Sequence, residues 1–207
     1  MFVEYDSDIP PPRQHPWTES AANPDWKYCD FKIHPDRIPF VLEDFSEWSR
    51  YPATTTFFEM LIWLNGPDSI LESNDCGLRP PRQDHESPEV IRCSFESDPT
   101  VIHARLAILF RDLAWNVSIP TINGLKQSIH DCLRQNFPDW PLAIKVGDWV
   151  HEFTALGKEG RVVTLRFWSW GDDEAMAMVN LKAAFDATFA CLRWVSDGVK
   201  KQSQQPK

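Results

Sequence analysis

Glycine is scarce in this chain of 207 residues, which contains eight glycines, all of them scattered. The glycine-rich loops that cradle phosphates, namely the Walker loop and the G-x-G-x-x-G turn, are missing. The sequence also lacks the G-x-S-x-G and H-E-x-x-H motifs, the EF-hand loop, the paired-cysteine zinc patterns and the deaminase signature. These absences exclude enzymes whose catalytic motifs are local in sequence, but not an enzyme whose site is built from dispersed residues.

Positive charge is also in short supply. The sequence has 21 Lys and Arg residues against 30 Asp and Glu residues, which gives a formal net charge of −9. This balance disfavours binding to nucleic acid through neutralisation of its phosphates. An acidic surface attracts basic partners instead, although the same charge also serves simply to keep a protein soluble.

Long apolar runs and targeting signals are missing too. No stretch approaches the roughly eighteen apolar residues of a membrane-spanning helix, and the N-terminus has neither the basic region nor the apolar core of a signal peptide. The five cysteines include no C-x-x-C pair, which is typical of reduced thiols in a cytoplasmic protein. The six histidines are isolated in the sequence. We therefore expect no membrane segment, no metal and no cofactor.

Apolar and aromatic residues, by contrast, are plentiful. The chain is 43% hydrophobic and 13% aromatic, so it can build a substantial core and is not disordered overall. We predict a proline-rich, extended arm over residues 1–25 and a single domain over residues 26–200. Residues 201–207 are expected to be a disordered polar tail.

The strongest pattern lies in the C-terminal third of the chain. The stretch Arg161–Trp170 is rich in β-branched and aromatic residues and has no Pro or Gly, which predicts a strand. Gly171 breaks this strand, and the acidic residues after it suit the first turn of a helix. Apolar side chains then recur every three or four residues, at Met178, Leu181, Phe185, Phe189, Leu192, Val195 and Val199. The sequence thus predicts a strand followed by a long helix that is buried on more than one side.

Further elements are predicted from composition and periodicity. Strands are expected at Trp26–Ile33, Glu89–Glu96 and Leu142–Phe153. Helices are expected at Phe57–Asn65, capped by one of the threonines 54–56, at Asp98–Trp115 and at Asn123–Asn136. Turn-forming residues at Asn74–Gly77 predict a hairpin-like excursion over Ser69–Leu78. Together these elements predict an α+β fold: a mostly antiparallel sheet of four to five strands packed against several helices, with a long C-terminal helix.

Three groups of residues are candidates for a functional surface. The first is a polar and reactive cluster on the expected excursion: Glu72, Asn74, Asp75, Cys76 and Arg79. The second is the acidic group Asp172, Asp173 and Glu174, which could bind a basic partner or a cation besides capping the helix. The third comes from ten tryptophans, of which several lie near strand ends, namely Trp140, Trp149, Trp168 and Trp170. Trp168 and Trp170 share one strand face, which would be an exposed aromatic platform if no helix covered it.

These observations favour a non-enzymatic protein-binding domain, such as an inhibitor or immunity protein, that docks a basic protein partner. The candidate contact residues are Trp168, Trp170, Asp172, Asp173, Glu174, Glu72, Asp75 and Arg79. One alternative is a hydrolase in which Cys76 is the nucleophile and His85 the base, with Glu72 beside them. Another is a homo-oligomeric subunit, a homodimer for example, that associates through the apolar helix Phe57–Asn65.

Overall fold

The computed structural model describes residues 2–7, 10–17, 28–38, 47–83, 98–136 and 141–203. Its strands are β1 (Phe2–Tyr5), β2 (Arg13–His15), β3 (Leu71–Leu78), β4 (Arg82–Gln83), β5 (Thr100–Phe110), β6 (Leu142–Phe153) and β7 (Lys158–Gly171). Its helices are α2 (Pro52–Asn65), α4 (Leu113–Asn116), α5 (Ile119–Asn136) and α6 (Glu174–Ser203), with a 3-10 turn η1 at Pro35–Arg37. The predicted α+β class is confirmed.

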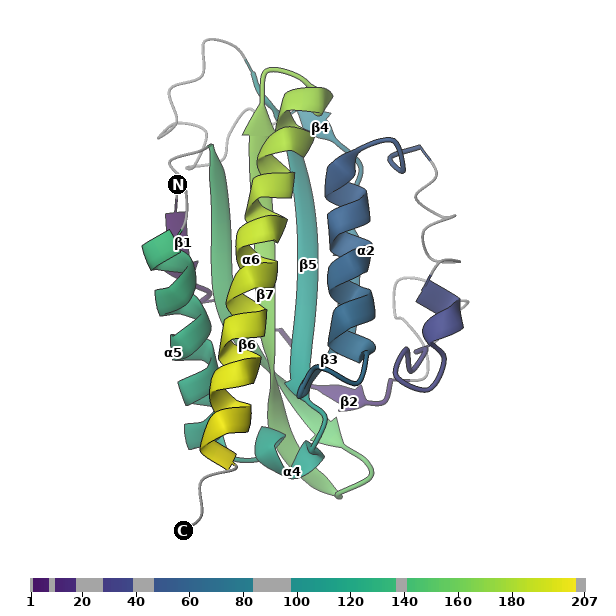
Figure 1. The fold of residues 1–207 in the computed structure, drawn as a ribbon, viewed down its shortest axis with the longest axis vertical. Coiled ribbons are helices and arrows are strands. Elements are labelled where there is room, and N and C mark those ends of the chain that lie inside the picture. The colour runs from purple at the N-terminus through teal and green to yellow at the C-terminus, as the bar shows by residue number, and fades with distance from the viewer. Residues whose placement is uncertain are drawn as a thin grey trace.

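The strands form one mixed, mostly antiparallel sheet with the order β1-β6-β7-β5-β3. Each of β6, β7, β5 and β3 is antiparallel to its neighbour in this series. β2 pairs with β6 and β4 with β5, off the main path. The helices α2, α5 and α6 cover one face of the sheet, and α6 runs down the middle of this layer between the other two (Figure 1).

The predicted strands Leu142–Phe153 and Arg161–Trp170 are confirmed as the hairpin β6–β7. The two strands pair in one continuous antiparallel register from Leu142 opposite Ser169 to Phe153 opposite Lys158. Gly157 has a φ of 57° in the turn between them, a conformation that glycine adopts without steric cost. The odd-numbered apolar residues of β7 face the helices, and Val163, Leu165 and Phe167 are buried in the main core.

The N-terminal segment contributes to the sheet. The stretch expected to form an extended arm supplies β1 and β2, which both pair in parallel with β6. Residues 18–25 of this arm lie outside the described residues, as do the predicted strand Glu89–Glu96 and the tail beyond residue 203.

The strand predicted at Trp26–Ile33 is wrong for the part that is described, because residues 31–33 form a turn. Asp30 Oδ1 accepts the backbone N–H of Lys32 at 2.9 Å, and the carbonyl of Asp30 accepts the N–H of His34 at 2.8 Å. An aspartate that bonds the backbone two residues ahead favours a turn over an extended strand.

The helix predicted at Asp98–Trp115 is also wrong, because residues 100–110 form the strand β5 in the interior of the sheet. Ile102, Leu106 and Ile108 face the helix layer, while Ala107 and Leu109 are buried on the other side. A strand that is buried on both faces shows no polar alternation, so its apolar residues can be mistaken for a helical stripe.

The hairpin-like excursion predicted over Ser69–Leu78 is a continuous strand, β3, which pairs with β5. The ladder shifts register between Ser73 and Asp75, which marks a β-bulge at Asn74. The turn-forming residues Asn74–Gly77 therefore interrupt a strand locally without reversing the chain.

α2 begins at Pro52, earlier than predicted, with Tyr51 as its N-cap and no side-chain capping bond. Its end at Gly66 is confirmed. The apolar residues proposed as an oligomer interface are largely in the core, with Phe57, Phe58, Met60, Leu61 and Leu64 all buried. Ile62 is 53% exposed and Trp63 is half-buried, so a homo-oligomer through this helix stays a prediction.

The long C-terminal helix is confirmed as α6, and it packs back on its own strand. Gly171 permits the tight connection, because a Cβ at this residue would lie 2.4 Å from the backbone nitrogen of Ala177. Ser169 Oγ donates to the carbonyl of Ala177 at 2.5 Å, and Asn180 Nδ2 donates to the carbonyl of Trp170 at 2.6 Å. Asn180 is buried, and its amide joins helix to strand.

By length and composition, the segment Glu174–Lys201 of α6 is long and apolar enough to cross a membrane. The expectation that no stretch meets this test is therefore wrong. In its most apolar window 50% of the residues are buried inside the fold, and core helices of soluble proteins pass the same test.

Phe185 should be a main determinant of stability, because its ring stacks on Phe57 at 4.9 Å and meets Phe167 edge-on at 5.2 Å. We expect Phe185→Ala to lower the free energy of unfolding by about 3–5 kcal/mol, since it leaves a cavity where three elements meet. Urea unfolding measures this loss. The neighbouring exposed change Asp186→Ala should cost roughly 0.5 kcal/mol or less, and similar losses for the two variants would contradict the packing described.

Candidate functional site

The predicted reactive cluster lies on β3, and the sheet divides it between two faces. Glu72 pairs with Leu109, whose side chain faces away from the helices, whereas Cys76 pairs with Leu106 and packs against the main core. Cys76 and Glu72 are therefore not brought together, and His85 lies outside the described residues. The arrangement of a hydrolase around these three residues gains no support.

Asn74, the residue in the bulge, joins two buried histidines. The Nδ1–H of His15 donates to Asn74 Oδ1 at 2.7 Å, and Asn74 Nδ2 donates to His151 Nε2 at 3.3 Å. The Nδ1–H of His151 then points to the carbonyl of Trp149 at 3.4 Å. The directions of these bonds are inferred from the network, in which both imidazoles are neutral. We call this chain of hydrogen bonds the histidine clasp.

Burial keeps the two imidazoles of the clasp neutral. Loss of solvation lowers the pKa of His15, and it lowers the pKa of His151 to about 4. His15 also accepts at its carbonyl from Thr154, so the clasp connects β2 with β3 and with the end of β6. The amide of Asn74 and both ring nitrogens of His151 are bonded within the clasp or to the backbone, which fits a role in holding the sheet together.

The two carboxylates of the cluster form ion pairs with basic residues of the same chain. Asp75 accepts from Arg13 and from Arg105, each at 2.8 Å, and both guanidinium groups lie over the ring of Trp149. Glu72, which is 2% exposed, accepts from Lys32 at 2.5 Å. Glu72 and Asp75 would have to give up these ion pairs to meet a basic partner. Arg79 is exposed, and its backbone N–H donates to the carbonyl of His103.

The tryptophans predicted as a platform differ in exposure. Trp170 is 0% exposed and packs with Val101 and Ala143, so it fills a core and offers no surface to a partner. Trp168 is half-buried, with Lys145 at 5.0 Å and Arg166 at 5.5 Å from its ring. These two cations would repel a basic partner at Trp168. Trp140 lies outside the described residues.

Of the acidic group Asp172, Asp173 and Glu174, Asp173 caps α6, as predicted. Asp173 Oδ1 accepts the backbone N–H of Met176 at 2.8 Å, and Glu174 pairs with Arg50 at 3.4 Å. Asp172 and Asp173 are exposed, so a binding role for them stays a prediction. Among the described residues, no group of three or more His, Cys, Asp or Glu side chains could hold a metal ion.

Sequence reasoning missed an apolar stripe on the outer face of α6. Met176, Val179 and Trp194 are 48%, 52% and 65% exposed, although α6 lies at the middle of the helix layer (Figure 1). Between them, on the same side of the helix, lie Ala183, Ala187 and Ala190. The spacing of three or four residues was a usable signal, but apolar residues surround most of this helix, so the outer and inner stripes could not be told apart.

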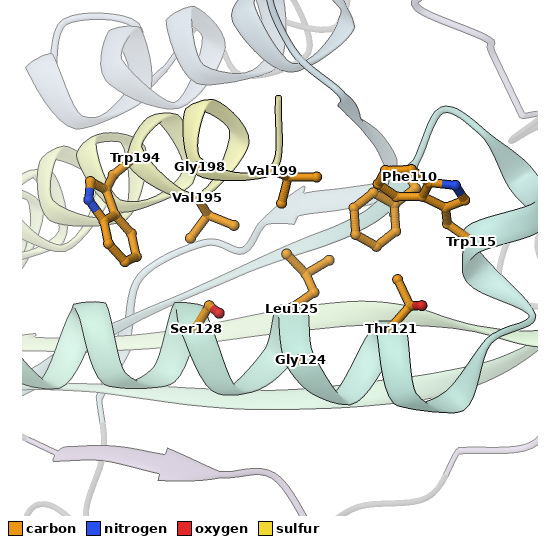
Figure 2. A pocket seen from close by; sticks show the side chains of 10 residues that line it. All are labelled: Phe110, Trp115, Thr121, Gly124, Leu125, Ser128, Trp194, Val195, Gly198 and Val199. Atoms are coloured by element: carbon orange, nitrogen blue, oxygen red, sulfur yellow. The ribbon is translucent and has the colours of Figure 1, made fainter. Parts of the chain in front are cut away.

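A groove of about 530 Å³ opens beside this stripe, between α5 and the C-terminal half of α6. Val195 and Val199 of α6 point toward Leu125 of α5, and Phe110 and Trp115 close the far end (Figure 2). Trp194 stands at the other end, and Thr121, Ser128 and two glycines complete the lining. The walls are mainly apolar, which suits the insertion of an apolar side chain.

Comparisons of the chain with protein-family models, with curated proteins and with solved structures found no match. Function has to be inferred from the residues themselves.

The histidine clasp should make stability depend on pH. His151 has its pKa near 4 in the folded protein, against an ordinary value of 6.5, so the unfolded chain binds the proton more readily. Stability is therefore full above about pH 6.5 and falls as the pH drops toward 4. We expect a loss of about 1.4 kcal/mol between pH 7.5 and 5.5 from this residue. Urea unfolding at the two pH values measures it.

His151→Gln should remove much of this pH dependence, while His34→Gln, at an exposed histidine, should leave it unchanged. Equal pH dependence in the wild type and the His151 variant would contradict the neutral clasp.

Cys76 should react slowly with thiol reagents. Burial, with Asp75 as a second cause, raises the pKa of this thiol to about 12, so the reactive thiolate is rare at neutral pH. We expect alkylation by iodoacetamide at least tenfold slower than that of a free thiol, measured site by site with mass spectrometry of digested protein. Reaction at Cys76 faster than at a free thiol would revive the nucleophile hypothesis.

Proposed function

We propose that this protein is a protein-binding domain that docks its partner on the outer face of α6. One observation carries the proposal: Met176, Val179 and Trp194 stay exposed along one side of a helix whose opposite side is packed in the core. Contiguous apolar surface marks sites of association, and tryptophan is enriched among the residues that dominate binding energy. The groove beside Trp194 offers a place for a side chain of the partner.

The charge of the protein gives a weaker indication of the partner. The net charge of −9 favours a basic protein, as expected for an inhibitor or immunity protein. Most of the negative excess, however, belongs to residues outside the described ranges, such as Asp84, Glu86, Glu89 and Glu96. Exposed Asp172 and Asp173, just before Met176, support a basic partner at that end of α6.

Trp194→Ala should weaken binding of the partner by about 2 kcal/mol, or roughly thirtyfold, if Trp194 is an anchor of the interface. The measurement compares the proteins retained from a host extract by immobilised wild type and variant, quantified by mass spectrometry. Ile33→Ala is the matched control, because Ile33 is an apolar side chain 67% exposed on a loop outside α6.

Retention that is insensitive to Trp194→Ala would count against this surface. Repeating the capture at low and high salt tests the partner's charge, since contacts between exposed charges are screened at high salt whereas apolar contacts persist.

A further inference from the structure

The side chains of the α6 stripe have nearly the same order of sizes when the helix is read backwards. From Met176 to Trp194 the stripe has large residues at both ends and Ala183, Ala187 and Ala190 in its middle. Met176 and Trp194 are equally far from position 185, and so are Ala183 and Ala187. Val179 and Ala190 lie at nearly equal distances, six residues before and five residues after position 185. If the α6 helix of a second copy packed antiparallel on the stripe, with its position 185 at the same level, side chains of similar size would lie opposite one another.

We propose that the outer face of α6 binds a second copy of this chain, with the two α6 helices antiparallel about a twofold axis near the level of Phe185. This inference rests on the proposed function and names the partner at the same surface. Most soluble oligomers are closed and symmetric, and a twofold interface must be complementary to itself. The palindromic order of the stripe meets that requirement.

The shape of the stripe suits two helices that cross. Small residues at the crossing point let helix axes approach to about 8 Å, the short end of the usual range. The helices diverge away from that point, and Met176 of one copy then lies across from Trp194 of the other, so that bulky side chains fill the wider gap. The stripe spans about 27 Å at 1.5 Å per residue, which allows contact over several turns.

The charges beside the stripe favour an antiparallel over a parallel pair of helices. Lys182 and Asp186 flank it on one side and form an ion pair at 2.6 Å within the chain. A twofold axis perpendicular to the antiparallel helices brings the same flank of both copies together. Lys182 then lies within about 3 Å, measured along the helix axis, of the level of the second copy's Asp186. The two Asp186 residues are also about 3 Å apart in level, so that the order along the axis is Lys182, Asp186, Asp186 and Lys182. A parallel pair would instead place Lys182 level with Lys182 and Asp186 level with Asp186.

The same flank argues against a basic protein as the occupant of the stripe. Its charged residues are Lys182, Asp186, Arg193, Asp197 and Lys200, three basic and two acidic. A flank without an acidic excess offers no net attraction to a strongly basic partner.

The mass of the purified full chain in solution tests the proposal, by sedimentation equilibrium from about 1 to 100 μM. Wild type should self-associate to a dimer and no further. Ala190→Arg, which places a bulky charge opposite Val179, should weaken the dimer at least tenfold, and Trp194→Ala should weaken it as well. Ile33→Arg, an equally drastic change on an exposed loop, should leave the dimer intact. Circular dichroism checks that Ala190→Arg is folded; if it is not, Trp194→Ala carries the test.

Cysteine cross-linking tests the direction of the helices. A mixture of Val179→Cys and Ala190→Cys proteins should form a disulfide-linked dimer on oxidation, while each variant alone should link no more than wild type. A parallel dimer would give the reverse pattern and overturn the proposal.

A chain that stays monomeric at 100 μM, or a dimer indifferent to Ala190→Arg, would also overturn the proposal. If the wild-type protein does not dimerise but still retains a host protein that the Trp194→Ala variant does not retain, the protein-binding function stands. Only the second copy as partner is then ruled out. If Trp194→Ala changes neither self-association nor capture, the proposed function fails too.

Discussion

The packing of α6 on the strand from which it emerges is the interaction on which the rest of the fold depends. Gly171 lets the chain turn back without a Cβ that would collide with the first turn of the helix. The bonds from Ser169 and Asn180 then fasten helix to strand, and the ring of Phe185 meets α2 and β7. With α6 fixed over the centre of the sheet, α2 and α5 can each pack on one of its sides.

The opposite face of the sheet is held by polar contacts. Asn74 can reach both His15 and His151 because a bulge displaces it from the β3 ladder. Arg13 and Arg105 neutralise Asp75 around Trp149, so charge that looked available for a partner is used within the chain. Buried polar groups of this kind are stable when every member is bonded, and they are costly when one is lost. The N-terminal strand β2 is thereby tied to distant parts of the sheet.

The surface that we propose for binding lies on the outer side of the helix layer. The sheet face opposite the helices carries internal ion pairs, and Trp170 there is buried, whereas the helix layer leaves one side of α6 in contact with solvent. Large apolar side chains on that side do not serve the core. Their order along the helix, with small residues between large ones, supports our proposal that this side of α6 binds another protein.

Sequence patterns by themselves determined the β6–β7 hairpin, α5, α6 and the α+β class, because β-branched and aromatic residues mark the two strands and apolar residues recur at helical spacing in the two helices. Clear boundaries, such as Gly171 and the cap at Asp173, also helped. They failed for β5, since Ile102 and Leu109 are buried on opposite faces and leave no polar alternation to read. They also failed at Asn74, where a turn-forming residue serves a bulge. The tertiary structure alone decided which side of α6 faces water. That choice depends on where α2, α5 and the sheet lie around the helix, and no spacing within the helix encodes the positions of its neighbours.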